Sequence, residues 1–506
     1  MEREVLVERR EALRRLGLAA AGVVCAGPAA GLLAGCAGED EPASSSATTA
    51  SPASSRPRAA ASVEDLDPSR PYWEQGGFRA VTEEVESTDL DVTGALPPEL
   101  TGLYVRNGSN PRSGTSPHWF LGDGMLHGVR IERGKAVWYR NRWVRTPLME
   151  AGTGFEDIPG GTNNQSNVAV VHHADRLLTL GEVGWPFELR TSDLSTVGAH
   201  DFGGRLGPTM TAHPKVDPVT GRMHFFGYGF TPPYLTYYVA DADGRLVLAE
   251  PVDVAKASMI HDFAITDRHA VFWEGPVLFG VEGPAPGMPY GWQPSYGSRI
   301  GVLPLEGPAS AIRWVEIDTC FVFHGLNAHR EGDDVVLVVS RLDEAFVPGR
   351  DVITDSPTRL HRWRIGTGGD ALTFRDETVT DIQMDLPTHD RRHTGRAVRH
   401  GWFTTTSDDG PWGFEFSGIC HLDLRTGRDQ RWEPGPLERA GEAFFVPAGR
   451  GEGEGWLLTY TYDRTVDRSH LAVFDAQDVA AGPVARVHLP VRVPYGFHGL
   501  WVADDA

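Results

Sequence analysis

Positive charge and cysteine are both scarce in this chain of 506 residues. Lysine and arginine together number 47 against 68 aspartates and glutamates, so the formal net charge is -21. Binding to the phosphates of nucleic acid requires a basic surface, and this balance therefore argues against a nucleic-acid partner. The sequence also lacks a glycine-rich motif for holding phosphates. Its four cysteines have no metal-type spacing, which excludes a cysteine-based metal site.

The first 36 residues have the features of an export signal. Residues 8–16 carry two pairs of arginines, and an apolar run follows from Leu16 to Ala34. This order is typical of a secretory signal, and the paired arginines indicate the twin-arginine route. The run ends in Leu-Ala-Gly-Cys36, which resembles a bacterial lipobox with an acylated cysteine. We expect residues 1–36 to be a twin-arginine, lipoprotein-type signal peptide, with a transmembrane anchor as the alternative.

Residues 37–65 are predicted to be a disordered linker. They are rich in serine, alanine, threonine, proline and acidic residues and have no apolar periodicity, so they cannot bury enough surface to fold. The protein would then be an exported lipoprotein on the extracytoplasmic face of the membrane, attached through lipidated Cys36. Of the other cysteines, only Cys320 and Cys420 would remain in the mature chain. They could pair in an oxidising compartment. However, the twin-arginine route exports proteins that have already folded in the reducing cytoplasm, so we expect two buried free thiols.

Long amphipathic helices and long apolar runs are missing from the rest of the chain. It contains instead 59 glycines and 36 prolines, with short apolar or alternating runs at residues 222–228, 270–273, 335–339 and 455–460. Many short strands separated by turn signals favour a sandwich, a barrel or a propeller. About 440 residues in one unit suit a propeller of six to eight blades, although no clear blade repeat is visible. The composition therefore predicts an all-β body over residues 66–506.

Four of the 19 histidines stand in distinctive local settings. His213 ends a Gly-Pro-Thr-Met-Thr-Ala-His segment before a predicted strand, and His261 is followed by Asp-Phe-Ala. His324 ends a Cys-Phe-Val-Phe-His segment, and His498 lies near the C-terminus in Tyr-Gly-Phe-His-Gly. Their separations of 48, 63 and 174 residues are too long for a local metal loop. They would suit one ligand from each of several blades, but spacing alone does not select these four.

These segments resemble the carotenoid cleavage oxygenase family, which includes apocarotenoid and stilbene-cleaving enzymes and the retinoid isomerohydrolase of the eye. Three further segments carry the resemblance: Leu103–Pro111, His118–Met125 and Tyr139–Arg145. It extends from about Leu96 to Val502. The resemblance implies a seven-bladed β-propeller with an axial metal site and one Fe(2+) ion. The implied metal ligands are the following: His213, His261, His324 and His498.

The resemblance also implies three carboxylates that accept the far N–H groups of the ligating imidazoles. Two of them match Glu182, in Leu-Gly-Glu, and Glu442, in Ala-Gly-Glu-Ala-Phe-Phe-Val-Pro. The third belongs to a Glu-Phe-Pro motif, where this chain reads Met-Asp-Leu-Pro and places Asp385. Asp385 is one methylene shorter than glutamate. We therefore expect it to reach its histidine at a longer distance, through water, or from a shifted strand.

The activity that the resemblance implies is a dioxygenase reaction, in which O₂ splits one C=C bond of a carotenoid or apocarotenoid into two carbonyl products. The partners would be a hydrophobic alkene and O₂. Trp185, Phe323 and Phe497 are the candidate substrate-binding residues. In family members that cleave hydroxystilbenes, a lysine directly precedes the first second-sphere glutamate. This chain has Gly181 at that position. The glycine provides no base for the phenol and leaves room beside Glu182, which favours carotenoids or apocarotenoids over stilbenes as substrates.

Other functions fit the same residues. The iron chemistry could instead cleave a stilbene-type aryl alkene or isomerise a substrate without oxidation. A non-catalytic propeller that binds a polyene is a second class. A calcium-dependent propeller lactonase is a third, but it would need oxygen ligands on the axis, where this sequence places imidazoles.

Overall fold

Strands make up most of the computed structural model, which describes residues 66–504 except 152–159, 285–286, 352–356, 409–411 and 413. The predicted signal peptide, residues 1–36, and linker, residues 37–65, lie outside the described residues. Within the described part of the chain, no helix has the length and apolar character needed to cross a membrane. Among the described residues, one short α-helix, α2 (Pro147–Ala151), and several 3-10 turns connect the strands.

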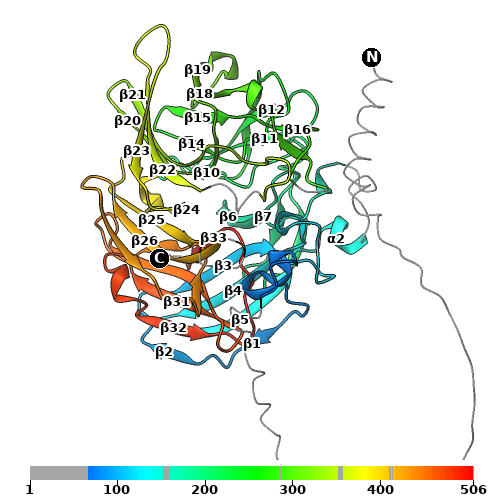
Figure 1. The fold of residues 1–506 in the computed structure, drawn as a ribbon, viewed down its shortest axis with the longest axis vertical. Coiled ribbons are helices and arrows are strands. Elements are labelled where there is room, and N and C mark those ends of the chain that lie inside the picture. Colours follow the sequence, from blue (N-terminus) through cyan, green and yellow to red (C-terminus); the bar gives the residue numbers. More distant parts are fainter. Residues whose placement is uncertain are drawn as a thin grey trace, which may run out of the picture.

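Seven sheets surround a common axis as the blades of a propeller, numbered here 1 to 7 in chain order (Figure 1). Blade 1 consists of β1 (Glu86–Ser87), β3 (Gly102–Ser109), β4 (Gly124–Glu132), β5 (Lys135–Trp143) and β33 (Gly499–Ala503). Blade 2 consists of β6 (Ala169–His173), β7 (Arg176–Leu180), β8 (Phe187–Leu189) and β9 (Thr196–Ala199). Blade 3 consists of β10 (Lys215–Val216), β11 (Met223–Tyr228), β12 (Leu235–Ala240) and β13 (Leu246–Val252).

Blades 4 to 7 follow the same antiparallel plan. Blade 4 consists of β14 (Phe263–Ile265), β15 (His269–Glu274), β18 (Ser298–Pro304) and β19 (Arg313–Ile317), and blade 5 consists of β20 (Phe321–Glu331), β21 (Asp334–Leu342), β22 (Arg359–Gly366) and β23 (Thr373–Thr380). Blade 6 consists of β24 (Met384–Thr388), β25 (His400–Ser407), β26 (Glu415–Asp423) and β27 (Arg428–Trp432). Blade 7 consists of β2 (Val92–Gly94), β28 (Glu438–Ala440), β29 (Phe444–Pro447), β30 (Gly455–Asp463), β31 (Arg468–Asp475) and β32 (Ala485–His488). A separate hairpin contains β16 (Val277–Phe279) and β17 (Tyr290–Trp292). In Figure 1, β6, β10, β24 and β33 lie near the centre, and β2, β19 and β32 lie at the periphery.

Segments from both ends of the described chain close the ring. The early strand β2 pairs with β32 on the outer side of blade 7, and the last strand, β33, pairs with β3 as the innermost strand of blade 1. Closure places every blade between two others, so no blade face is left uncovered between the first and the last blade. Closure also brings His498, the residue before β33, next to the axis. The predictions of an all-β chain and of a seven-bladed propeller are both confirmed.

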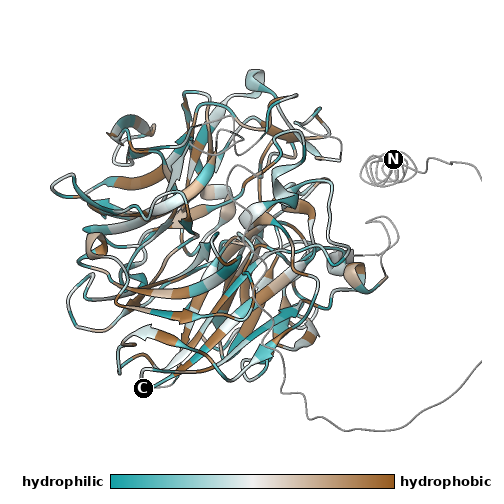
Figure 2. Ribbon diagram, turned by 60° about the horizontal axis from the view of Figure 1, so that its bottom comes forward, coloured by the Kyte–Doolittle hydropathy of each residue, from teal (hydrophilic) through white to brown (hydrophobic). Residues whose placement is uncertain are grey.

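Apolar residues on both faces of the blades form the core. All eight residues of β3 and all six of β11 are buried, because each blade is packed between two others. The apolar runs predicted at residues 222–228, 335–339 and 455–460 fall in β11, β21 and β30. In Figure 2, apolar segments recur along the strands of successive blades.

Cys320 and Cys420 are free and buried, as expected from the sequence. Burial raises the pKa of the Cys320 thiol to about 11 and that of the Cys420 thiol to about 12. Since the thiolate is the reactive form, both side chains act as small apolar core residues at neutral pH.

Removing a core side chain from the closing strand should destabilise the propeller. Leu500, in β33, is 6% exposed, whereas Leu437 is 50% exposed. We expect Leu500→Ala to lower the free energy of unfolding by about 2–5 kcal/mol, because it leaves a cavity. The midpoint in scanning calorimetry should fall by a few degrees. Leu437→Ala makes the same chemical change on the surface and should stay within about 0.5 kcal/mol of wild type. Equal midpoints for the two variants would contradict this role for the strand.

Candidate metal centre

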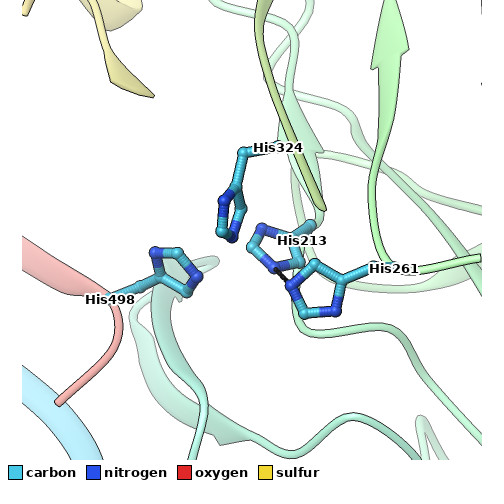
Figure 3. A group of neighbouring side chains, drawn as sticks. All are labelled: His213, His261, His324 and His498. Carbon is cyan, nitrogen blue, oxygen red and sulfur yellow. Dashed lines mark hydrogen bonds between the residues drawn. The ribbon is translucent and has the colours of Figure 1, made fainter. Parts of the chain in front are cut away.

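Four histidines from four different blades converge near the propeller axis (Figure 3). His213, His261 and His498 each lie shortly before the innermost strand of a blade, whereas His324 lies within β20. Their ligand atoms all lie within 4.8 Å of one another. Sites built on adjoining strands are held more rigidly than sites on long loops, so the blades fix these side chains relative to one another.

Backbone hydrogen bonds to neighbouring blades fix the segments that carry these histidines. The N–H of His498 donates to Val168 O at 3.0 Å, and the N–H of Asn107 donates to His498 O at 3.1 Å. Thr211 connects two other members of the cluster. Its hydroxyl donates to His261 O at 3.2 Å and accepts from the N–H of His213 at 3.3 Å. The backbones of His213, His261 and His498 are therefore held independently of the contacts that their side chains make.

A β-bulge accompanies the position of His324. The register of β20 against β21 shifts between Val322 and Gly325 and again between Gly325 and Asn327. Bulges of this kind turn a side chain out of the regular alternation of a strand. Glycine suits this place, since a Cβ at position 325 would lie 3.0 Å from the Trp273 ring. The irregular strand thus directs the imidazole toward the axis.

The nitrogen atoms of the cluster fit a shared metal ion. His213 Nε2 and His261 Nε2 are 3.0 Å apart, and His324 Nε2 is buried without a hydrogen-bond partner among the described residues. Two imidazole nitrogens that bind one metal ion at right angles, each at about 2.1 Å, lie about 3.0 Å from each other. A metal ion would satisfy the buried nitrogen as well. Imidazole ligands suit several transition metals, iron among them.

Carboxylates lie against the outer nitrogens of two of these histidines. Glu442 Oε1 is 2.7 Å from His498 Nδ1, and its Oε2 accepts the N–H of Gly499 at 2.7 Å. Glu182 Oε2 is 2.7 Å from His261 Nδ1, but it lies off the direction of the N–H, so this contact is electrostatic rather than a well-formed hydrogen bond. A carboxylate at Nδ1 fixes the tautomer that leaves Nε2 free for a metal ion.

Asp385 reaches His324 directly. Its Oδ1 is 3.0 Å from His324 Nδ1, which is 0.3 Å longer than the 2.7 Å contact between Glu442 and His498. The register of β24 shifts between Asp385 and Thr388, and Leu386 has a positive φ of 52°. The shorter side chain of Asp385 therefore makes a direct but longer contact, and it does so from a shifted strand.

Each blade contributes one side chain to this centre. The contributors from blades 1 to 7 are, in order, His498, Glu182, His213, His261, His324, Asp385 and Glu442. Asp385 and Glu442 pair with histidines from an adjacent blade, whereas Glu182 and its partner His261 come from blades 2 and 4.

Burial and neighbouring charges shift the pKa values of these imidazoles in different directions. Burial holds the pKa of His213 well below its usual value, and the neighbouring histidines lower it further. Burial also lowers the pKa of His498, although the carboxylate of Glu442 opposes this effect. For His324, burial lowers the pKa, but the charge and hydrogen bond of Asp385, together with the charges of Asp262 and Glu442, raise it above its usual value on balance. His213 and His498 are thus neutral at neutral pH, the form in which histidine binds a metal ion.

Two of the three predicted substrate-binding residues lie beside the cluster. The ring of Phe323 is perpendicular to that of His261 at 5.2 Å between centroids. Phe497 is the residue before His498, and its ring lies 5.8 Å from Phe120, which in turn lies 6.3 Å from Phe323. These rings form an apolar surface next to the histidines.

Trp185, the third predicted substrate-binding residue, is half-buried between blades 2 and 3. Its indole N–H donates to Gly207 O at 2.7 Å, and its ring packs against the core between blades 2 and 3. These contacts hold the segment before His213, and none of the ring contacts in the described part of the chain joins Trp185 to the four histidines. The space expected at Gly181 is also missing, because a Cβ there would lie 3.0 Å from Asn164 Oδ1 and 3.3 Å from the nitrogen of Ser166.

Sequence reasoning missed several residues of the site. Phe120 lies inside the segment His118–Met125, which carries the family resemblance but was not predicted to bind substrate. The hydroxyl of Tyr228 donates to Glu182 Oε1 at 2.6 Å and lies 3.2 Å from that of Tyr290. No local sequence signal marks these two tyrosines, since they come from β11 and from the hairpin strand β17. Asp262 was also missed, although it directly follows His261.

Comparisons with known proteins agree with this geometry. A sequence-family model described as "Retinal pigment epithelial membrane protein" matches residues 78–503. A Mycobacterium tuberculosis protein named carotenoid cleavage oxygenase is 36% identical, and the match covers 85% of this chain and 97% of that protein. Carotenoid 9,10(9',10')-cleavage dioxygenase 1 of Phaseolus vulgaris is 33% identical, covering 86% and 90%. The crystal structure of Pseudomonas brassicacearum lignostilbene dioxygenase superimposes with a TM-score of 0.79 at 29% identity, covering 86% and 99%.

Removal of one histidine of the cluster should greatly weaken metal binding. We expect His324→Ala to weaken metal affinity at least about 100-fold, because loss of an outer partner alone costs about 10- to 100-fold. The measurement is metal content by mass spectrometry after dialysis, together with the dissociation constant.

His361→Ala is the matched control for this experiment. His361 lies in blade 5 like His324, is 7% exposed, and pairs through Nδ1 with Asp376 at 2.7 Å, but it lies outside the cluster. It should retain wild-type metal content. Equal metal content in the two variants would show that the cluster does not bind the ion.

Proposed function

The chain belongs to the carotenoid cleavage oxygenase family, and from this premise we propose that it is an Fe(II)-dependent dioxygenase that splits one C=C bond of a carotenoid or apocarotenoid into two carbonyl products. It is an enzyme of the carotenoid-cleavage type, acting on a hydrophobic alkene with O₂. The single observation that carries the finer proposal is the cluster of four imidazoles, three of them paired with carboxylates.

Iron is the proposed metal because of what the reaction requires. Zinc suits imidazole ligands but has no redox chemistry, whereas an oxygenase needs a metal that exchanges electrons with O₂. When bound, Fe(II) supplies that exchange, which no side chain in the cluster provides. The residues that would hold it are His213, His261, His324 and His498, whose nitrogen atoms lie within 4.8 Å of one another.

The remaining residues of the site would bind and orient rather than react. Asp385 and Glu442 hydrogen-bond to the outer nitrogens of two imidazoles, and Glu182 lies against that of a third, so the inner nitrogens keep one direction. Phe120, Phe323 and Phe497 offer flat apolar surfaces on which a conjugated chain can pack. One alkene and one O₂ balance two carbonyl products, so the reaction needs no external reductant.

A carotenoid or apocarotenoid is the proposed substrate. Position 181 is a glycine, so no lysine stands before Glu182 to act on a phenol, and two similar proteins are named for carotenoid cleavage. The second candidate is a stilbene-type aryl alkene, which the similarity to a lignostilbene dioxygenase favours. Both reactions would use the same histidines.

Cleavage of an apocarotenal under ¹⁸O₂ tests the proposal. The iron-loaded protein is incubated aerobically with an apocarotenal and, separately, with a hydroxystilbene, and products are identified by mass. We expect aldehyde fragments from the apocarotenal, each labelled with one ¹⁸O atom, and no product from His261→Ala. Cleavage of the stilbene alone would overturn the proposed substrate but keep the reaction. No product from either, despite bound iron, would favour an isomerase or a polyene-binding protein.

We also propose that the protein is exported through residues 1–36 and attached to the membrane through lipidated Cys36. The paired arginines and the Leu-Ala-Gly-Cys sequence support this proposal. Such a tether would keep the enzyme beside the lipid phase in which carotenoids dissolve. We expect Cys36→Ala to move the protein from the membrane fraction to the soluble exported fraction, with Cys25→Ala as control. Membrane attachment that survives Cys36→Ala would contradict lipidation at this residue.

A further inference from the structure

His213 differs from the other three histidines of the cluster. His261, His324 and His498 each have a carboxylate at Nδ1, whereas among the described residues His213 has none. Its polar contacts are the hydrogen bond from its backbone N–H to the Thr211 hydroxyl and the close approach of its Nε2 to that of His261. The direction of the His213 ring therefore depends on how firmly the backbone segment that carries it is held.

A buried carboxylate next to the cluster connects to that segment. Asp262 has a side chain that is only 2% exposed, and its Oδ1 lies 2.7 Å from Lys215 Nζ. The same oxygen accepts the N–H of Phe263 at 2.7 Å, and Oδ2 accepts the N–H of Gly325 at 3.0 Å. Both carboxylate oxygens are thus hydrogen-bonded, which offsets the cost of burying the charge.

Every partner of Asp262 is close in sequence to a histidine of the cluster. Lys215 is two residues after His213, Asp262 itself follows His261, and Gly325 follows His324. One carboxylate therefore connects the innermost strands of blades 3, 4 and 5. It also accepts the N–H of Gly325, which lies between the two register shifts beside His324.

Stability alone is a weak explanation for this buried pair. Replacing a buried ion pair by well-packed apolar residues is often neutral or stabilising, because desolvation offsets the attraction between the charges. One carboxylate that makes an ion pair with Lys215 and accepts a hydrogen bond from Gly325 does, however, fix the distance and direction between the two segments that carry these residues. In this place they restrain three strands relative to one another at the level of the metal cluster.

We infer that Asp262 and Lys215 are positioning residues of the metal centre, which hold the backbone segment that carries His213 relative to the strands that carry His261 and His324. The inference rests on the proposed metal-binding function of the cluster. It assigns to Asp262 a role in binding the metal ion without direct contact. The expected consequence of losing it is a weaker and distorted site in a protein that still folds.

Asp262→Asn tests the inference through metal binding rather than activity. Metal-free protein is titrated anaerobically with Fe(II), and in parallel with Co(II), whose visible spectrum reports the coordination. We expect affinity to fall about 10- to 100-fold and the Co(II) spectrum to change, as for loss of other outer partners of metal ligands. Lys215→Met should weaken binding by a smaller factor. The double variant should be no weaker than Asp262→Asn, because the two residues act as one pair.

Asp423→Asn is the matched control. Asp423 is also a buried aspartate that accepts backbone N–H groups, from Arg425 and Thr426, and pairs with a cation, Arg399, but it lies at the end of β26 in blade 6 and outside the cluster. It should bind Fe(II) within about twofold of wild type. If Asp262→Asn loses thermal stability as this control does, but keeps wild-type affinity and spectrum, the pair is merely structural and the inference is wrong.

Two further outcomes are distinguishable. If Asp262→Asn does not accumulate as folded protein, Lys215→Met decides the question, since the lysine side chain is 22% exposed. Wild-type affinity and spectrum in Lys215→Met would then overturn the inference. Wild-type protein that binds Fe(II) but cleaves nothing would count against the proposed reaction alone, because the comparison of affinities would still hold.

Discussion

Closure of the ring by β33 is the constraint on which the rest of this structure depends. The strand completes blade 1 from the far end of the chain, and the residue before it is His498. The backbone of His498 is bonded on one side to blade 1 and on the other to the segment that leads into blade 2. His213 and His498 are 285 residues apart in sequence. The cluster therefore exists only in the folded ring, and binding of a metal ion would stabilise that ring relative to the unfolded chain.

The seven blades divide between them the two tasks of a metal site. Four blades supply imidazoles, which as ligands do not neutralise the charge of a divalent ion. The other three supply carboxylates, which contact the imidazoles rather than the ion. These carboxylates are themselves held in place: Glu442 accepts the N–H of Gly499, and Glu182 accepts the hydroxyl of Tyr228. Each hydrogen bond restrains a group that in turn restrains an imidazole. Rigid support of this kind preserves the direction of the inner nitrogens.

Much of the fold could be predicted from composition and pattern. Abundant turn formers and short apolar runs indicate many strands, and the runs near residues 222–228 and 455–460 became β11 and β30. The number of blades came from resemblance rather than from periodicity, because successive blades share little sequence. The separations of the four histidines, likewise, would have selected no site without the motifs around them.

The sequence by itself determined which residue types stand at the positions of the cluster, since a motif carries its histidine or glutamate whatever surrounds it. The tertiary structure alone decided how those residues pair. Glu182 lies against His261, not against His213, which is nearer in sequence, and Asp385 reaches His324 directly because its strand is shifted. It also placed Trp185, half-buried, against the core of blades 2 and 3 and Asp262 at the junction of three blades. The physical reason is that these contacts depend on strand register and side-chain length across neighbouring blades, which distance along the chain does not encode.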